Sequence, residues 1–164
     1  MIGTAGSDAK TNHLRETLGF DVALNYRAPD FALQLAAAAP EGIDAFFDNV
    51  GGMQLQAAMP LMRRHGRIAI CGSIASYNDT QPQAFSGFDA VLNQRLRIEG
   101  FLVYDHEDRM PEFVAEVAPM VAAGRIAGPK TILEGLDNVP AALISLFTGE
   151  TIGKTLVRLT TESS

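Results

Sequence analysis

Two polar stretches rich in small residues each follow an apolar run that predicts a buried strand. Residues 48–52 (Asp-Asn-Val-Gly-Gly) follow the run at 43–47, and residues 71–77 (Cys-Gly-Ser-Ile-Ala-Ser-Tyr) follow the run at 67–70. The carboxyl ends of the strands in an open parallel sheet form its ligand crevice. Two such ends about twenty residues apart therefore predict one cofactor cleft.

Each stretch also has a purely structural interpretation. Asp48 and Asn49 could bond a ribose or an amide of a cofactor, but Asp-Asn before glycines is equally good turn chemistry. Hydroxyls and the phenol of Tyr77 lie in the second stretch, which could be an ordinary strand exit. Cys71 alone is better explained as a small buried apolar residue than as a nucleophile. The order of the stretches on successive strands favours a binding site.

A third strand end, after residues 1–5, indicates which cofactor would be bound. NAD sites place an acidic residue at this position, whereas NADP sites lack it and supply a cation. Here Gly6 and Ser7 occupy the end, and Lys10 follows one helical turn later, where its ammonium could meet a 2′-phosphate. The alternative is a capped helix with a solvated lysine. The segment favours NADPH over NADH.

Composition narrows the function classes. The 164 residues carry a net charge of −6, which opposes nucleic-acid binding, and no apolar run approaches the ~20 residues that span a bilayer. A single cysteine permits neither an internal disulfide nor a thiolate zinc cluster, and no histidine has a partner at metal-ligand spacing, so no metal site is predicted. Without a secretory signal pattern, a cytoplasmic protein is expected.

Apolar runs of four to six residues alternate with amphipathic stretches, the rhythm of βαβ units. This predicts an α/β fold with a Rossmann-like doubly wound parallel sheet. Strands are expected at 1–5, 21–25, 43–47, 66–71, 98–104, 131–134 and 154–159, and helices at 8–18, 29–39, 52–64, 110–123 and 136–147. Pro60 should kink or shorten the third helix.

The ordered segments resemble the zinc-independent medium-chain dehydrogenase/reductase family, and its prostaglandin, alkenal and curcumin reductase branch in particular. The resemblance covers essentially the whole chain. Its segments are Gly6-Ser7-Asp8-Ala9-Lys10, Leu24-Asn25-Tyr26-Arg27, Phe47-Asp48-Asn49-Val50-Gly51-Gly52, Gly66-Arg67-Ile68-Ala69-Ile70-Cys71-Gly72, Ser76-Tyr77-Asn78 and residues 149–154.

The resemblance implies an NADPH-dependent enzyme that reduces the carbon–carbon double bond of α,β-unsaturated ketones and aldehydes. Lys10 resembles the lysine at the 2′-phosphate, Tyr26 a residue near the adenosine phosphate, and Asn49 the asparagine beside the cofactor. Thr151 stands where the family usually has a cofactor-binding asparagine. The remaining cofactor positions are Cys71, Gly72, Ser73 and Tyr77 in one loop, and Phe101, Leu102 and Val103 in a strand flanking the nicotinamide.

Hydride transfer to an enone leaves an enolate that needs a hydrogen-bond donor. Tyr77 is the candidate phenol beside the cleft and is the predicted catalytic residue. The strand at 98–104 is the expected edge of a homodimer.

The resemblance also implies a missing front part, because relatives carry another domain and then the first strand and glycine-rich turn. Residues 1–125 would be a partial dinucleotide-binding domain, and residues 126–164 a segment that in relatives returns to the front domain. The absent strand is central in the Rossmann order. Its loss would require a rearranged sheet, a strand from a partner chain, or a longer reductase of which this chain is a piece.

Two other functions remain open. The first is a catalytically inactive module that binds cofactor or forms oligomers. The second is a methyltransferase-like α/β domain, which predicts an acidic residue at the end of the first strand; Gly6 and Ser7 stand there and argue against it.

Overall fold

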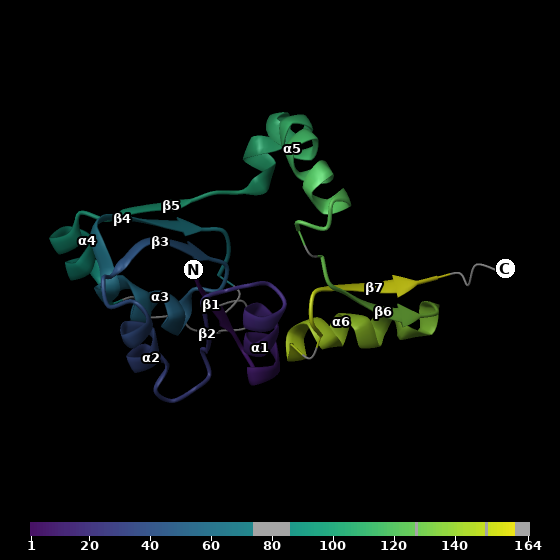
Figure 1. The fold of residues 1–164 in the computed structure, drawn as a ribbon, viewed down its shortest axis with the longest axis horizontal. Helices are drawn as coiled ribbons and strands as arrows, with labels where there is room; N and C mark the ends of the chain where they lie inside the picture. The colour runs from purple at the N-terminus through teal and green to yellow at the C-terminus, as the bar shows by residue number, and fades with distance from the viewer. Residues whose placement is uncertain (74–85, 127, 150, 160–164) are drawn as a thin grey trace. The chain divides into compact units, whose positions relative to one another are not determined.

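The computed structural model describes residues 1–73, 86–126, 128–149 and 151–159. The chain forms two compact units, Met1–Asp108 and Arg109–Ser164 (Figure 1). The boundary predicted at residue 125 separates a cofactor-binding part from a C-terminal segment by role, not by compactness, and it stays a prediction. In the described part of the chain no helix is both long and apolar enough to cross a membrane.

The first unit contains two separate parallel sheets. β1 (Ile2–Ala5) pairs with β2 (Val22–Asn25), and β4 (Met62–Ile70) lies between β3 (Ile43–Asp48) and β5 (Arg97–Gly100). Every pair of neighbouring strands is parallel, which confirms the predicted α/β class with parallel sheets. β1 and β3 are not hydrogen-bonded to each other, so the strands are divided between two sheets, as expected for a parallel sheet that lacks its central strand.

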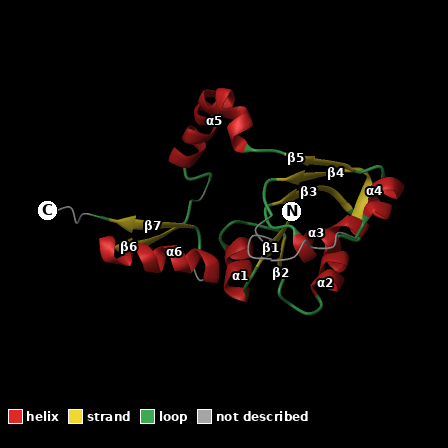
Figure 2. Ribbon diagram, turned by 180° about the vertical axis from the view of Figure 1, so that it is seen from behind, coloured by secondary structure: helices red, strands yellow, loops and turns green. Residues whose placement is uncertain are grey.

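A helix lies between each strand of this unit and the next one along the chain, as in βαβ units (Figure 2). α1 (Asp8–Glu16) is preceded by its N-cap residue Ser7, whose hydroxyl accepts a hydrogen bond from the Lys10 amide at 3.4 Å, as is typical of an N-cap. The core of the unit is buried around Phe31, Met59 and Ile68, each at most 1% exposed. The helices of this unit are α1 (Asp8–Glu16), α2 (Phe31–Ala38), α3 (Gly52–Ala58) and α4 (Phe88–Gln94).

Two predicted elements were wrong. The helix expected at 52–64 ends at Ala58, a 3-10 turn (Met59–Leu61) contains Pro60, and β4 already begins at Met62. Pro60 lacks the amide proton that a helix interior needs, and burial of Met62 to 2% exposure favours the strand. The strand expected at 98–104 stops at Gly100, and a 3-10 helix, η3, covers Val103–Arg109.

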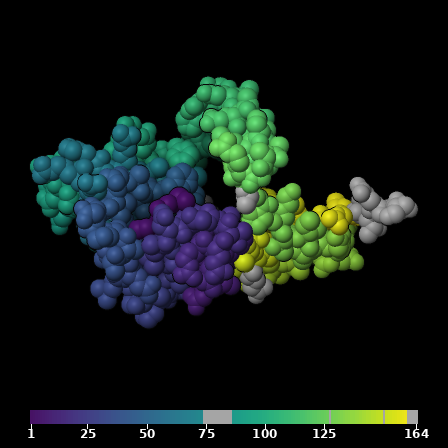
Figure 3. Space-filling view, in the orientation of Figure 1, coloured from purple at the N-terminus to yellow at the C-terminus, as the bar shows by residue number. Residues whose placement is uncertain are grey.

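The second unit holds a helix and a βαβ element. α5 (Met110–Ala122) is followed by β6 (Lys130–Glu134), α6 (Val139–Thr148) and β7 (Lys154–Arg158), and β6 pairs in parallel with β7. Gly149 closes α6 in the left-handed conformation, with φ 68°, as glycine often does at a helix end. The residues of α6, yellow-green in Figure 3, form part of the surface of this unit, and several of the exposed side chains of α6 are large and apolar. They include Leu143, Ile144, Leu146 and Phe147, at 56–76% exposed.

Candidate cofactor site

Asp48, the last residue of β3, organises the adjoining turns of β3 and β4. Its side-chain Oδ1 accepts hydrogen bonds from the amides of Val50 (2.9 Å) and Gly51 (2.7 Å). Its backbone carbonyl accepts from the amides of Cys71 (2.8 Å) and Gly72 (3.2 Å). Because Asp48 is only 2% exposed, its carboxylate serves the turn and is not presented to a ligand. Of the two interpretations of this motif, turn chemistry therefore describes Asp48.

The two turns pack closely because both contain glycine. A Cβ on Gly72 would stand 3.0 Å from the carbonyl oxygen of Asn49, and one on Gly51 would stand 3.8 Å from the backbone of Ser73. Gly51 also has φ 73°, a conformation that favours glycine. This packing leaves the side chain of Asn49 exposed at the strand end, where a ligand can reach it.

A hollow of about 350 Å³ opens where β4 and β5 end. The structure here brings together five of the predicted cofactor residues, from two segments about thirty residues apart in the sequence. Cys71 is exposed, so the expectation that it is a buried apolar residue was wrong. The hollow is lined by Ile70, Cys71, Gly72, Ser73, Gly100, Phe101, Leu102 and Asp105.

Aromatic rings support one wall of this hollow. The ring of Phe101 lies 6.0 Å from that of Phe47, between centroids, and 6.5 Å from that of His106. The amide of Phe101 donates to the carbonyl of Ile70 at 3.1 Å, so Phe101 continues the pairing with β4 although it lies outside β5. Its position is therefore fixed both by the backbone and by ring packing.

A second group of predicted residues gathers at the ends of β1 and β2. A Cβ on Gly6 would stand 2.8 Å from the Tyr26 hydroxyl and 3.4 Å from Nε of Arg27, so both side chains cross the end of β1. The Arg27 guanidinium also lies 5.9 Å from the centre of the Tyr26 ring. Lys10 is half-buried in the first turns of α1.

Sequence reasoning missed Arg27 as a binding candidate. Its position beside Tyr26 in the chain was the available signal, but only the structure shows its guanidinium next to Gly6. The nearest acidic group in the first turn of α1, Asp8, accepts a hydrogen bond from Asn25 Nδ2 at 2.8 Å. This end of the sheet therefore offers a cation that the motif alone did not predict.

The prediction also named Val103, Thr151 and Tyr77. Val103 begins the 3-10 helix η3 and is 58% exposed, and it is not among the residues lining the hollow. Thr151 lies in the second unit, where its hydroxyl is 3.0 Å from that of Thr155. Tyr77 lies outside the described residues.

Among the described residues, no group of three or more histidine, cysteine, aspartate or glutamate side chains could hold a metal ion. The chemistry that the described strand ends offer is instead that of exposed backbone, small side chains and cations. Such surfaces bind extended, phosphate-bearing ligands along the carboxyl ends of parallel strands.

The chain is similar to known proteins over nearly its whole length. Residues 1–119 match the family described as zinc-binding dehydrogenase. The chain is 38% identical over 163 residues to the NADP(+)-dependent 2-alkenal reductase of Nicotiana tabacum, covering 99% of this chain and 48% of the relative. It is 39% identical over 165 residues to the NADPH-dependent curcumin reductase of Escherichia coli, covering 97% of this chain and 48% of the relative.

A solved structure is similar to this chain in both fold and sequence. The crystal structure of CurA from Vibrio vulnificus in complex with NADPH superposes with a TM-score of 0.89 at 37% identity, over 98% of this chain and 49% of that one. The chain spans about half the length of the relatives it matches. It belongs to the zinc-binding dehydrogenase family, in the zinc-independent medium-chain reductase branch that its motifs predicted.

Proposed function

We propose that the first unit binds NADPH along the carboxyl ends of its strands. In this proposal, the polypeptide to which it belongs reduces the carbon–carbon double bond of α,β-unsaturated ketones or aldehydes. The observation that carries the proposal is the meeting of the β4 and β5 ends around one hollow, with cations at the β1 and β2 ends. Relatives named as NADPH-dependent alkenal and curcumin reductases support it.

The described residues fit the cofactor at both of its ends. Gly6 and Ser7 leave the end of β1 without a carboxylate, and Lys10 and Arg27 supply positive charge near it, which suits a 2′-phosphate. The hollow at β4 and β5 has an aromatic wall and small residues, which suits a flat ring. Asn49 is exposed between these two groups along the sheet edge.

Bound NADPH would supply the hydride. The chain's own residues would orient the ring and exclude water from it: Phe101 and Leu102 from one side, and the glycine-bearing turn at Gly72 from the other. We propose Tyr77 as the donor that stabilises the enolate oxygen as its charge develops. Residues 1–125 would hold the cofactor, and residues 126–164 would contribute Thr151, whose hydroxyl can replace one contact of an amide.

Lys10→Ala tests the cofactor assignment. Loss of one charged hydrogen bond, worth about 1.5–3 kcal/mol, should weaken NADPH binding roughly tenfold to hundredfold and leave NADH binding unchanged. Arg15→Ala is the matched control, because it removes the same charge from the same helix near its other end. Fluorescence titration with both nucleotides makes the measurement. Equal losses for NADPH and NADH, or an equal effect of Arg15→Ala, would refute the assignment.

Turnover distinguishes the enzyme from an inactive module. Consumption of NADPH in the presence of a simple alkenal, followed by absorbance, is the expected result for the complete polypeptide. Nucleotide binding by that polypeptide without turnover of any enone or enal would support the module instead, and would overturn the enzymatic proposal while leaving the cofactor site intact.

We also propose that the protein is a cytoplasmic homodimer joined through β5. All four residues of β5 are exposed, and it is an outer strand of its sheet. The Phe101 amide bonds to β4, so by alternation the amide of Ile98 points away from β4. Ile98→Pro should therefore remove an edge donor and give a monomer in sedimentation equilibrium, whereas Ile98→Ala should not. A dimer that survives Ile98→Pro would contradict the β5 interface.

A further inference from the structure

The hollow at the ends of β4 and β5 has a carboxylate in its wall. Asp105 is the one acidic or basic residue among the described residues that line the hollow, and it is exposed. The other described lining residues are apolar or carry a hydroxyl, a thiol or no side chain. A single negative charge in an otherwise uncharged wall gives the hollow a negative electrostatic potential.

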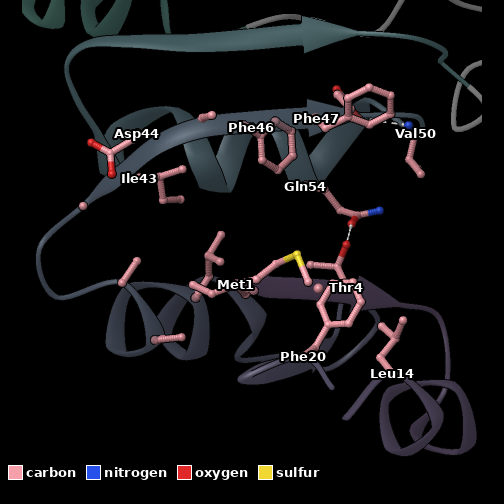
Figure 4. A pocket seen from close by; sticks show the side chains of 18 of the residues that line it. Met1, Thr4, Leu14, Phe20, Ile43, Asp44, Phe46, Phe47, Val50 and Gln54 are labelled. Carbon is pink, nitrogen blue, oxygen red and sulfur yellow. Dashed lines mark hydrogen bonds between the residues drawn. The ribbon is translucent and has the colours of Figure 1, made fainter. Parts of the chain in front are cut away.

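The backbone holds Asp105 close to this wall. Its amide donates a hydrogen bond to the carbonyl of Leu102 at 3.1 Å. Phe101 is anchored in turn, because its amide donates to the carbonyl of Ile70 and its ring packs against Phe47. Figure 4 shows Phe47 at the carboxyl end of β3, where it also lines a cavity between β1 and β3. The segment that carries the Asp105 carboxylate is therefore tied to β3 and β4 only four residues upstream.

No cation neutralises this carboxylate in the described part of the chain. The Asp105 side chain forms no hydrogen bond or ion pair with a described residue. The two arginines that flank it in the sequence are already paired, Arg97 with Glu99 at 2.8 Å and Arg109 with Glu112 at 3.3 Å. The charge of Asp105 is therefore available to whatever occupies the hollow.

Asp48 also has a carboxylate near these strand ends, but that carboxylate belongs to its own turn. It is 2% exposed, its Oδ1 accepts the amides of Val50 and Gly51, and its Oδ2 is buried without a hydrogen-bond partner among the described residues. Asp48 is not among the residues that line the hollow. Asp105 is therefore the carboxylate that an occupant of the hollow can meet.

The charge of the wall bears on the redox state of a nicotinamide nucleotide. Hydride transfer moves one hydrogen and two electrons from C4 of the dihydronicotinamide to the β-carbon of an enone. The enone is reduced to an enolate, and the nucleotide is oxidised, which leaves one positive charge on a ring that was neutral. A carboxylate beside the ring attracts this cationic form more strongly than the neutral form.

We propose that Asp105 favours the oxidised nucleotide in the hollow and so makes bound NADPH a stronger hydride donor. This inference rests on the proposed function, in which the hollow receives the nicotinamide ring. Asp105 stays ionised throughout and exchanges neither a proton nor a hydride. Its attraction grows as positive charge develops, so it stabilises the transition state more than the bound reactants.

The small size of the hollow determines the magnitude of the effect. Opposite unit charges roughly 5–8 Å apart in mostly aqueous surroundings change an equilibrium constant about threefold to tenfold. A hollow of about 350 Å³ does not allow a much larger separation. The affinity for NADP⁺ relative to NADPH should therefore depend on Asp105 by this factor.

The test compares the dissociation constants of NADP⁺ and NADPH, measured by titration calorimetry on the complete polypeptide without any enone. Asp105→Asn removes the charge at nearly constant size. It should raise the ratio of the NADP⁺ constant to the NADPH constant about threefold to tenfold, mainly by weakening NADP⁺ binding. Asp105→Glu keeps the charge and should leave the ratio within about twofold of the wild-type value.

Asp108→Asn is the matched control. It removes the same charge from the same 3-10 helix, at an exposed residue that does not line the hollow. The ratio of the two dissociation constants should be unchanged in this variant. An equal effect of Asp108→Asn and Asp105→Asn would overturn the inference, because any acid of the helix would then serve.

Two results for Asp105→Asn would also overturn the inference. One is an unchanged ratio, and the other is equal weakening of both nucleotides, which would show that Asp105 holds the nucleotide by a hydrogen bond or supports the fold. The NADPH site of the proposed function would stand in both cases, since the wild-type protein still binds both nucleotides. A wild-type protein that binds neither nucleotide would overturn the proposed function, and this inference with it.

Discussion

Replacement of Asp48 should destabilise the first unit more than replacement of any exposed acid in the same strand. Its carboxylate is buried and accepts two backbone amides, at 2.9 and 2.7 Å. Hydrogen bonds to a charged acceptor contribute about 1.5–3 kcal/mol each, so Asp48→Ala removes about 3–6 kcal/mol of gross interaction. It also removes Oδ2, whose unpartnered burial costs about 1–3 kcal/mol. The expected net loss in the free energy of unfolding is about 2–4 kcal/mol.

Asp44 provides the matched control. It lies in the same strand, but its side chain is 78% exposed and its ion pair with Arg63 is at the surface. Such pairs contribute about 0–1 kcal/mol, so Asp44→Ala should change stability little. Asp48→Asn should fall between the two alanine variants, because an amide oxygen can accept the same hydrogen bonds without the charge.

Urea unfolding measures the difference as a shift in midpoint at constant slope. Hydrogen exchange at the amides of Val50 and Gly51 gives an independent measurement, restricted to the turn itself. Faster exchange at these two amides is expected in Asp48→Ala only. The reasoning is refuted if Asp48→Ala and Asp44→Ala differ by less than about 0.5 kcal/mol while the turn amides exchange equally in both.

Three further substitutions each test one contact in the first unit against a control. Thr4→Val removes the hydroxyl that donates to the Gln54 side-chain oxygen at 2.6 Å, and Gln54 is only 4% exposed. The free energy of unfolding, measured by thermal unfolding, should fall by about 1–3 kcal/mol, whereas Thr4→Ser should lower it much less. Gly72→Ala, whose Cβ would stand 3.0 Å from a carbonyl oxygen, should destabilise by about 1–3 kcal/mol and weaken NADPH binding. Gly100→Ala, with 3.9 Å of clearance, should not destabilise the protein. Arg27→Ala should weaken NADPH binding roughly tenfold without affecting NADH in the same titration.

Each of these outcomes can fail separately. Equal stability of Thr4→Val and Thr4→Ser would show that the hydroxyl does not contribute. A Gly72→Ala variant as stable as Gly100→Ala would show that the turn can move aside. Unchanged selectivity in Arg27→Ala would remove Arg27 from the binding site.

Local patterns predicted the parts of the fold that local interactions determine. The first helix was expected at 8–18 and is observed at Asp8–Glu16, because the Ser7 cap and the following turns are encoded in adjacent residues. Pro60 was expected to kink or shorten the third helix, and α3 does end just before it, but the strand that follows could not be predicted in the same way. Residues 62–64 are compatible with a helix, and they become strand because β3 and the buried core offer them long-range partners.

The candidate site likewise has parts that local sequence predicted and parts that depend on long-range contacts. Glycines and polar residues at the ends of β3 and β4 predicted a cleft there, since parallel strands bring their carboxyl ends together. The hollow beside Cys71 is completed instead by residues that follow β5, of which Phe101 and Leu102 were expected only from the family resemblance. The role of Asp48 within its turn could not be separated from ligand binding until its hydrogen bonds were known. Arg27 needed the three-dimensional approach of β2 to Gly6, a contact between segments that no short motif contains.

The uncovered face of α6 has a practical consequence for handling the protein. Phe147 is 76% exposed and Ile144 is 61% exposed on one short helix. Exposed apolar surface of this kind favours aggregation. Preparations of these 164 residues should stain brightly with the dye ANS, copurify with holdase chaperones, and precipitate on concentration. Expression as a fusion with a solubilising protein should keep these residues in solution.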